Sequence, residues 1–243
     1  MTRSILITGA SSGIGQATAR RFLDEGWIVG LVARREAPLQ AMAEQYDTAI
    51  PLPADVTDEA GLDAAFDAFA ETAGRIDVLF NNAGISGPQS TIDKISLADF
   101  QDVVSVNLTG MFLGARAAFR IMRAQNPQGG RIINNGSISA HTPREGLVCY
   151  TTTKHAITGL TKTLSLDGRE FDIACGQIDI GNAETAMVEE LNARLEAQGK
   201  PKNPVMNVQD AANSILHMAS LPLEANVQFM TILATKMPYI GRG

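Results

Sequence analysis

Short apolar runs alternate with longer amphipathic stretches along the whole chain. The run SILIT at 4–8 ends at a glycine and predicts a buried strand. Residues 13–25 then carry apolar side chains at helical spacing, and Gly26 follows as a stop signal. The same criteria predict further strands at 28–33, 48–52, 78–80, 131–134, 174–178 and 227–233. They predict further helices at 39–46, from Thr57 through 69, from Ser96 onward, and at 110–122, 150–166, 183–198 and 208–219.

This alternation predicts the fold class. Strands that are joined through helices run parallel, with the crossover helices on both faces of the sheet. We therefore expect an α/β protein with a doubly wound parallel sheet of about seven strands. No linker, repeat or low-complexity segment divides the chain, so residues 1–243 are expected to form a single domain. The polar, proline-containing stretch 199–204 is expected to be a mobile loop over a site.

A glycine-rich turn, TGASSGIG at 8–15, joins the first predicted strand to the first predicted helix. Glycine lets the backbone approach a pyrophosphate, and the helix N-terminus offers free N–H groups to its charge. Such a turn alone is weak evidence, but at this position it predicts a dinucleotide-binding Rossmann fold. The residues expected to bind the cofactor are Gly9, Ser11, Ser12, Gly13, Ile14 and Gly15.

Tyr150 and Lys154 lie four residues apart on a predicted helix, and therefore on one face of it. Hydride transfer to a carbonyl carbon leaves an alkoxide that needs a proton, so an acid/base is required there. A free phenol ionises only near pH ~10, and a neighbouring ammonium or oxidised nicotinamide ring favours the ionised form. Because this spacing occurs by chance in many helices, the assignment of Tyr150 depends on its surroundings.

The turn and the Tyr–Lys pair together resemble the classical short-chain dehydrogenases/reductases, over nearly the whole chain. The resemblance implies two further catalytic residues. Ser137, thirteen residues before Tyr150, corresponds to the serine that hydrogen-bonds the substrate oxygen. Asn107 corresponds to the asparagine that helps hold a proton-relaying water near Lys154. In this family the lysine also holds the ribose hydroxyls of the cofactor.

The resemblance implies further cofactor contacts beyond the strand ends. Asp55 and Val56 correspond to a pair that contacts the adenine. The motif NNAG at 81–84 is partly structural in the family and partly lines the adenosine side. Its members expected near the cofactor are Asn81, Ala83 and Gly84.

The segment DIGNAET at 179–185 departs from the family pattern, because Ile180 replaces a proline and Gly176 an asparagine. Thr185 keeps the family's position and is expected to reach the nicotinamide carboxamide or the diphosphate. The backbone near it is expected to pass close to the cofactor at Ile180, Gly181 and Asn182.

Residues after the second predicted strand indicate which dinucleotide is preferred. An acidic side chain there would bond the ribose 2′-hydroxyl of NAD and repel a 2′-phosphate. Here Ala33 is followed by Arg34 and Arg35. Arginine binds a phosphate through two parallel hydrogen bonds, so we expect NADP, with NAD possible. The alternative is that both arginines are solvated residues at a helix start.

Composition adds exclusions. The formal net charge of −6 argues against a nucleic-acid partner, which needs clustered cations. The two cysteines show no metal-ligand spacing, so no metal is expected. So few cysteines indicate a reducing compartment. No signal-peptide pattern and no apolar stretch of about 18 residues is present, so we expect a cytoplasmic protein without a membrane partner.

The sequence therefore predicts an NADP-dependent oxidoreductase that moves a hydride between nicotinamide and a small-molecule secondary alcohol or carbonyl, with Tyr150 as acid/base. The alternatives are an NAD-linked polyol or hydroxy-acid dehydrogenase, and a non-catalytic dinucleotide-sensing module. Segment 182–206 is expected to close over the substrate. His141 and Arg144 could contact a polar substrate, although a solvated surface is the stronger expectation. The resemblance implies a homotetramer or homodimer.

Overall fold

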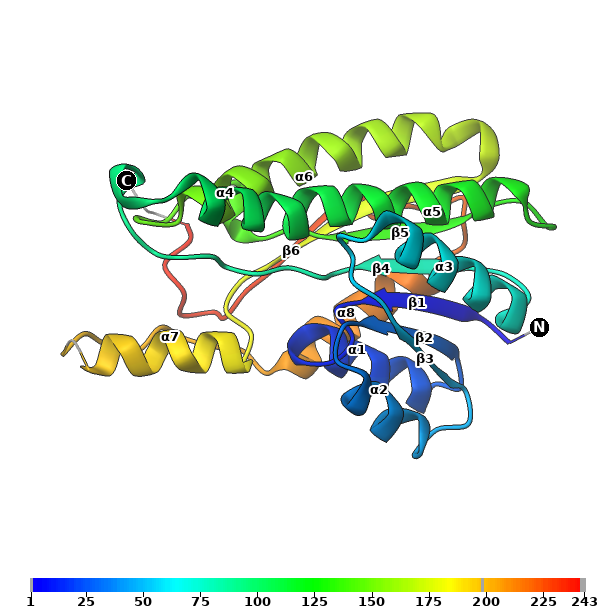
Figure 1. Ribbon diagram of the computed structural model, residues 1–243, viewed down its shortest axis with the longest axis horizontal. Helices are drawn as coiled ribbons and strands as arrows, with labels where there is room; N and C mark the ends of the chain where they lie inside the picture. Colours follow the sequence, from blue (N-terminus) through cyan, green and yellow to red (C-terminus); the bar gives the residue numbers. More distant parts are fainter. Residues whose placement is uncertain (1, 198, 241–243) are drawn as a thin grey trace.

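A computed structural model describes residues 2–197 and 199–240. Its strands form one parallel sheet in the order β3-β2-β1-β4-β5-β6-β7, which confirms the predicted doubly wound sheet (Figure 1). The chain order reverses between β1 and β4, so the connections that leave these two strands run to opposite faces of the sheet. The strands are β1 (Ser4–Thr8), β2 (Ile28–Ala33), β3 (Ala49–Pro53), β4 (Val78–Asn81), β5 (Gly130–Asn135), β6 (Ile173–Ile180) and β7 (Phe229–Ile232).

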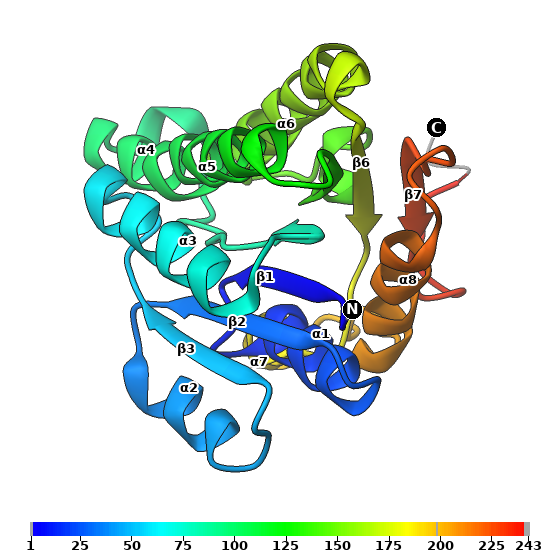
Figure 2. The ribbon, with the colours of Figure 1, turned by 90° about the vertical axis from the view of Figure 1, so that its right-hand side faces the viewer.

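Helices cover both faces of the sheet (Figure 2). One face carries α1 (Gly13–Asp24), α2 (Glu36–Ala43) and α8 (Val208–Ser220). The other carries α3 (Glu59–Ala73), α4 (Leu97–Val104), α5 (Gly110–Ala124) and α6 (Val148–Asp167). The remaining helix, α7 (Ala186–Ala197), projects beyond the carboxyl ends of the strands (Figure 1). Helical turns lie at η1 (Ile92–Lys94), η2 (Ser105–Thr109), η3 (Ile138–Ala140) and η4 (Arg169–Phe171). Within the described ranges, none of the helices has the length and apolar character needed to cross a membrane.

The two cores follow from the period-two alternation of strand side chains. In β1, Ile5 and Ile7 pack in the cluster under α1, α2 and α8. Leu6, between them, points to the opposite face and joins Phe66 and Phe69 of α3. All five side chains are fully buried, and each such burial stabilises the fold by about 1.5–3 kcal/mol.

Four helix starts differ from the predictions, one of them that of α7, which begins at Ala186 rather than at residue 183. Helix α2 begins at Glu36 rather than at residue 39, since Pro38 in a first turn costs no helical hydrogen bond. The cap of α3 is Asp58 and not Thr57, whose backbone N–H and hydroxyl both donate to Asp55. Helix α6 begins at Val148, two residues before Tyr150. The predicted end of the helix that corresponds to α7, at residue 198, lies outside the described residues.

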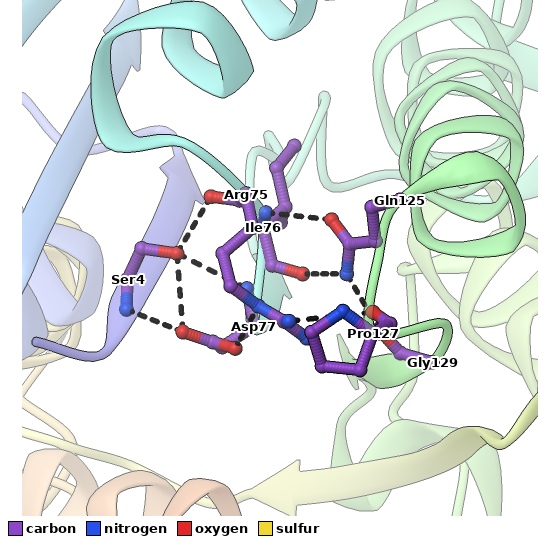
Figure 3. Close-up of polar contacts among 7 residues, drawn as sticks. All are labelled: Ser4, Arg75, Ile76, Asp77, Gln125, Pro127 and Gly129. Atoms are coloured by element: carbon purple, nitrogen blue, oxygen red, sulfur yellow. Dashed lines mark hydrogen bonds and ion pairs between the residues drawn. The ribbon is translucent and has the colours of Figure 1, made fainter. Parts of the chain in front are cut away.

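A cluster of polar contacts fastens the amino edge of the sheet (Figure 3). The Asp77 carboxylate accepts the backbone N–H of Ser4 at 2.9 Å and pairs with Arg75 at 2.6 Å. The Gln125 side chain, from the end of α5, bonds both backbone groups of Ile76 at 3.0 Å. These contacts fix the start of β4 against β1 and α5, while the opposite, carboxyl edge carries the polar clefts described next.

Candidate active site

The ends of β1 and β4 meet where the strand order reverses, and glycine makes that approach possible. Gly9 has φ +72°, and a Cβ on it would stand 2.9 Å from the Ala83 Cα. A Cβ on Gly15 would stand 2.3 Å from the Gly9 carbonyl oxygen. Gly15 therefore lies beneath the turn, where it lets α1 pack closely, rather than in the cleft above it.

The start of α1 provides an anion-binding position. Its cap, Ser12, makes no hydrogen bond from its side chain, and no acidic residue stands in the first turn. Gly13 adopts φ +56°, a conformation that favours glycine. The first N–H groups of a helix have no helical partner and carry the positive end of its dipole. These features fit a dinucleotide pyrophosphate.

A cleft of about 360 Å³ extends from this helix start, and we call it the switch-point cleft. The predicted cofactor residues that line it are Gly9, Ser11, Ser12, Gly13, Ile14, Arg34, Arg35, Asp55, Val56, Ala83, Gly84, Tyr150, Lys154 and Thr185. It is also lined by residues that sequence reasoning missed or left open, which are Ala33, Ala54, Asn82, Ile85, Val106, Asn135 and Ala186. Most of these adjoin a predicted residue in the chain, and that adjacency is the signal that would have found them.

Asn81 does not lie in this cleft, which corrects half of its predicted role. Its side chain is 2% exposed and donates to the Met111 carbonyl of α5 at 2.7 Å. Its amide oxygen lies 3.4 Å from the Thr8 hydroxyl. The side-chain amide of Asn81 holds the sheet to α5. Of the two roles expected for Asn81, structural and cofactor-lining, the structure therefore supports the structural one.

The two arginines after β2 have different surroundings. The Arg35 guanidinium donates to the Ser11 hydroxyl at 3.1 Å, directly over the glycine-rich turn. Arg34 lies 3.9 Å from the Asp55 carboxylate, with 73% of its side chain exposed. This corner of the cleft holds two cations against one carboxylate, which leaves an excess positive charge beside the turn.

Lys154 is buried and held from the strand side. Its ammonium donates to the Asn135 carbonyl at 2.7 Å, at the end of β5. The same nitrogen lies 5.5 Å from the centre of the Tyr150 ring, as the shared helix face predicts.

Asn107 stands in a π-helical turn between α4 and α5 and is fully buried. Its side-chain amide bonds the backbone N–H and carbonyl of Ile85, both at 2.8 Å, and lies 3.3 Å from the Thr153 hydroxyl. The side chain therefore clamps the loop after β4 onto the helices. Both N–H groups of the side chain are used in these bonds, so a water held by Asn107 would contact its main chain or the second lone pair of Oδ1.

A second cleft, of about 320 Å³, adjoins the first beneath α7, and we call it the α7 cleft. Ser137 and Tyr150 both line it. Ile180, Gly181 and Asn182, whose backbone is expected near the cofactor, line it as well. Ile14, Asn135, Tyr150 and Thr185 are common to both clefts.

Arg144 is half-buried in the wall of the α7 cleft and donates to the Asn182 side chain at 3.0 Å, so the expectation of a solvated surface is wrong for this residue. Apolar side chains of α7, including Leu191 and Leu195, line the opposite wall. Part of segment 182–206 thus bounds this cleft.

Sequence reasoning missed Asp179 altogether. It lies one residue before the end of β6 and is 0% exposed. Its carboxylate accepts the Ser137 backbone N–H at 2.9 Å and the Gln177 amide at 2.7 Å, and lies 2.7 Å from the His141 Nε2. A charged side chain inside a strand of apolar neighbours was the one available signal.

Comparison with known proteins agrees with this geometry. A family model described as short chain dehydrogenase matches residues 3–196. The chain belongs to the short chain dehydrogenase family and is an oxidoreductase of that family. Levodione reductase of Leifsonia aquatica is 37% identical over 208 residues, which cover 83% of this chain and 76% of the reductase.

Solved structures resemble the whole fold. The 3-ketoacyl-(acyl-carrier-protein) reductase from Brucella melitensis, complexed with NADH, superposes with a TM-score of 0.84 at 27% identity, covering 95% of this chain and 96% of that one. ElxO with NADP bound gives a TM-score of 0.85 at 25% identity, over 96% and 97% of the two chains. Both nicotinamide dinucleotides thus occur among the structural relatives.

Proposed function

We propose that this protein is an NADP-dependent oxidoreductase acting on a small-molecule secondary alcohol or the corresponding carbonyl. One observation carries the proposal: Tyr150 lines both clefts, with the Lys154 ammonium 5.5 Å from its ring. The switch-point cleft would hold the dinucleotide, and the α7 cleft the substrate. A proton donor at their junction is what the reaction requires.

The bound nicotinamide would supply or accept the hydride. Ser137 positions the substrate oxygen: its Oγ accepts the Ser139 N–H at 3.1 Å, which leaves its own O–H to donate. Tyr150 gives its proton to that oxygen in reduction and takes it back in oxidation. Lys154 stabilises the phenolate left behind, and the carbonyl of Asn135 keeps the ammonium in place.

The NADP preference is supported by the excess of cations beside the glycine-rich turn. A 2′-phosphate on the adenosine ribose would meet Arg35 and Ser11, which already bond each other at 3.1 Å. The bound cofactors of the structural relatives, NADH in one and NADP in the other, are compatible with either choice. The preference for NADP is therefore inferred from Arg34 and Arg35 of this chain.

We further infer that the chain acts as a single domain and as a homodimer or homotetramer. Residues of the two clefts come from both halves of the sheet, so neither half contains a complete site. Phe112 of α5 and Leu166 of α6 are exposed large apolar side chains, and a groove of about 710 Å³ lies between these helices. A second copy would cover this surface. The buried free thiols Cys149 and Cys175 support a reducing, cytoplasmic location.

The test is Tyr150→Phe, assayed with a panel of alcohols and carbonyls by absorbance of the reduced cofactor. We expect kcat to fall by roughly 10²–10⁴, the usual contribution of a general acid/base, with the cofactor dissociation constant changed by less than about twofold. Tyr46→Phe is the matched control, because that hydroxyl bonds Asp24 on the surface, and its kcat should not change.

Undiminished turnover in Tyr150→Phe would remove Tyr150 from the mechanism. Tight cofactor binding by the wild type without turnover of any compound in the panel would favour the dinucleotide-sensing module instead.

A further inference from the structure

Directly behind Ser137 lies a buried carboxylate that the mechanism above does not use. One oxygen of Asp179 accepts two N–H groups, from the Ser137 backbone at 2.9 Å and the Gln177 side chain at 2.7 Å. The other oxygen lies 2.7 Å from Nε2 of His141. The carboxylate is 0% exposed, whereas 40% of the His141 side chain is exposed.

Placing a charge there is costly, so the surrounding structure has to compensate for it. A carboxylate without water needs hydrogen bonds to nearly all of its lone pairs, and three N–H donors supply them here. The backbone also makes room: a Cβ on Gly136 would stand 2.0 Å from the Asp179 oxygen. Because Gly136 has no side chain, the backbone at the end of β5 can pass directly over the carboxylate.

The three contacts connect the parts of the chain that build the α7 cleft. Ser137 follows β5, and His141 lies in the segment that leads on to α6 and Tyr150. Asp179 itself immediately precedes Ile180, which lines the cleft. One side chain therefore fixes the serine, the segment between serine and tyrosine, and the strand end beside the substrate.

We propose that Asp179, held in place by His141, is a positioning residue that sets the Ser137 hydroxyl for the substrate oxygen. This inference rests on the proposed function. Asp179 acts through the Ser137 backbone N–H, which it anchors, while Ser139 N–H anchors the Oγ from the other side at 3.1 Å. His141 is exposed, as expected from the sequence, and its contact with Asp179 gives it a defined role as well.

A double-mutant cycle with Ser137 separates positioning from simple stabilisation. Asp179→Ala removes the side chain that accepts the Ser137 N–H, and we expect kcat to fall by up to roughly 100-fold, the cost of misplacing a group at the reacting centre by about 1 Å. In a Ser137→Ala background the same substitution should lower kcat less than twofold, because the group that it positions is gone. The dissociation constant of NADPH should stay within about twofold throughout.

Asp179→Asn is the conservative variant. Its oxygen can accept the Ser137 and Gln177 donors, and its amide can donate to the other tautomer of His141. We expect it to restore kcat to within about fivefold of the wild type. His141→Ala removes one donor and should lower kcat in the wild type but not in Asp179→Ala.

Asp77→Ala is the matched control, since Asp77 also accepts a backbone N–H and pairs with a cation, but at the amino edge of the sheet (Figure 3). It should lower the melting temperature while kcat stays unchanged. Kinetics are compared below the melting transition of every variant.

Additive effects of Asp179→Ala and Ser137→Ala, or a full kcat in Asp179→Ala, would overturn the inference while leaving Tyr150-dependent turnover intact. If Asp179→Ala does not fold, an unaltered kcat in His141→Ala would overturn it. Absence of any Tyr150-dependent turnover in the wild type would overturn the proposed function and this inference together.

Discussion

Replacement of Arg35 by alanine tests how the protein distinguishes its two possible cofactors. The Arg35 guanidinium stands 3.1 Å from the Ser11 hydroxyl, at the edge of the glycine-rich turn. NADPH differs from NADH by one phosphate, which would carry about two negative charges. The substitution removes a cation that only this phosphate would engage, so the two cofactors should respond differently.

The magnitude follows from the exposure of the site. A hydrogen bond to a charged group contributes about 1.5–3 kcal/mol. Because the Arg35 contact is exposed, we discount it to about 1–2 kcal/mol for solvent screening. Arg35→Ala should then raise the NADPH dissociation constant roughly 5- to 30-fold and leave that of NADH within about twofold. Arg34→Ala should have a smaller effect, since Asp55 at 3.9 Å already offsets part of its charge.

Fluorescence of the reduced nicotinamide provides the titration for both cofactors. At about 1 M salt, where the screening length is about 3 Å, the difference between wild type and Arg35→Ala should shrink. Arg20→Ala is the control, because this exposed arginine bonds Gln45 instead of the turn. Equal wild-type affinities for NADPH and NADH, or an equal loss of both in Arg35→Ala, would refute the assignment of NADP.

Two predictions concern stability. The Arg131 side chain is 1% exposed, and one of its nitrogens donates to the carbonyls of residues 221, 222 and 225. Arg131→Met should therefore lower the free energy of unfolding by about 3 kcal/mol and the melting temperature by about 6–12 °C. The kcat at low temperature should not change. A melting temperature unchanged by this substitution would show that the loop is held by other contacts. Burial raises the pKa of the Cys175 thiol from 9.0 to about 12. The unfolded chain then loses this proton near pH 9 while the folded chain keeps it, so stability should fall as the pH rises from 9 towards 12. Urea unfolding at pH 8 and pH 10 should show a smaller decrease for Cys175→Ala than for the wild type, and identical decreases would contradict the shift.

The order of strands and helices was predictable because it depends on local periodicity. Apolar runs and amphipathic stretches alternate without interruption, and parallel connections of this kind admit few topologies. The pairing of Tyr150 with Lys154 is local as well, since four residues make one helical turn. Gly9 belongs to the same class, because a turn between adjacent elements requires a backbone conformation that glycine adopts most easily.

The start of α3 shows where local reasoning reaches its limit. Thr57 has the composition of a helix cap, yet its hydroxyl and N–H both bond Asp55, which forms a tighter turn just before the helix. The helix consequently begins one residue later, after Asp58. The local sequence does not indicate that the Thr57 hydroxyl will donate to Asp55 instead of accepting from the first turn of the helix.

Tertiary structure alone decided which polar side chains face the clefts. Asn81 is the first residue of the NNAG motif, but its side-chain amide donates to the Met111 carbonyl. Asp179 and His141 are 38 positions apart in the chain and contact each other in the fold. Local sequence determined this protein's fold class, its glycine-rich turn and its Tyr150–Lys154 pair, since each depends on neighbours within a turn or two. The identity of the side chains behind Ser137 depended on how β5 and β6 align, because hydrogen-bond partners distant in sequence are selected only when the packed strands bring them within about 3 Å.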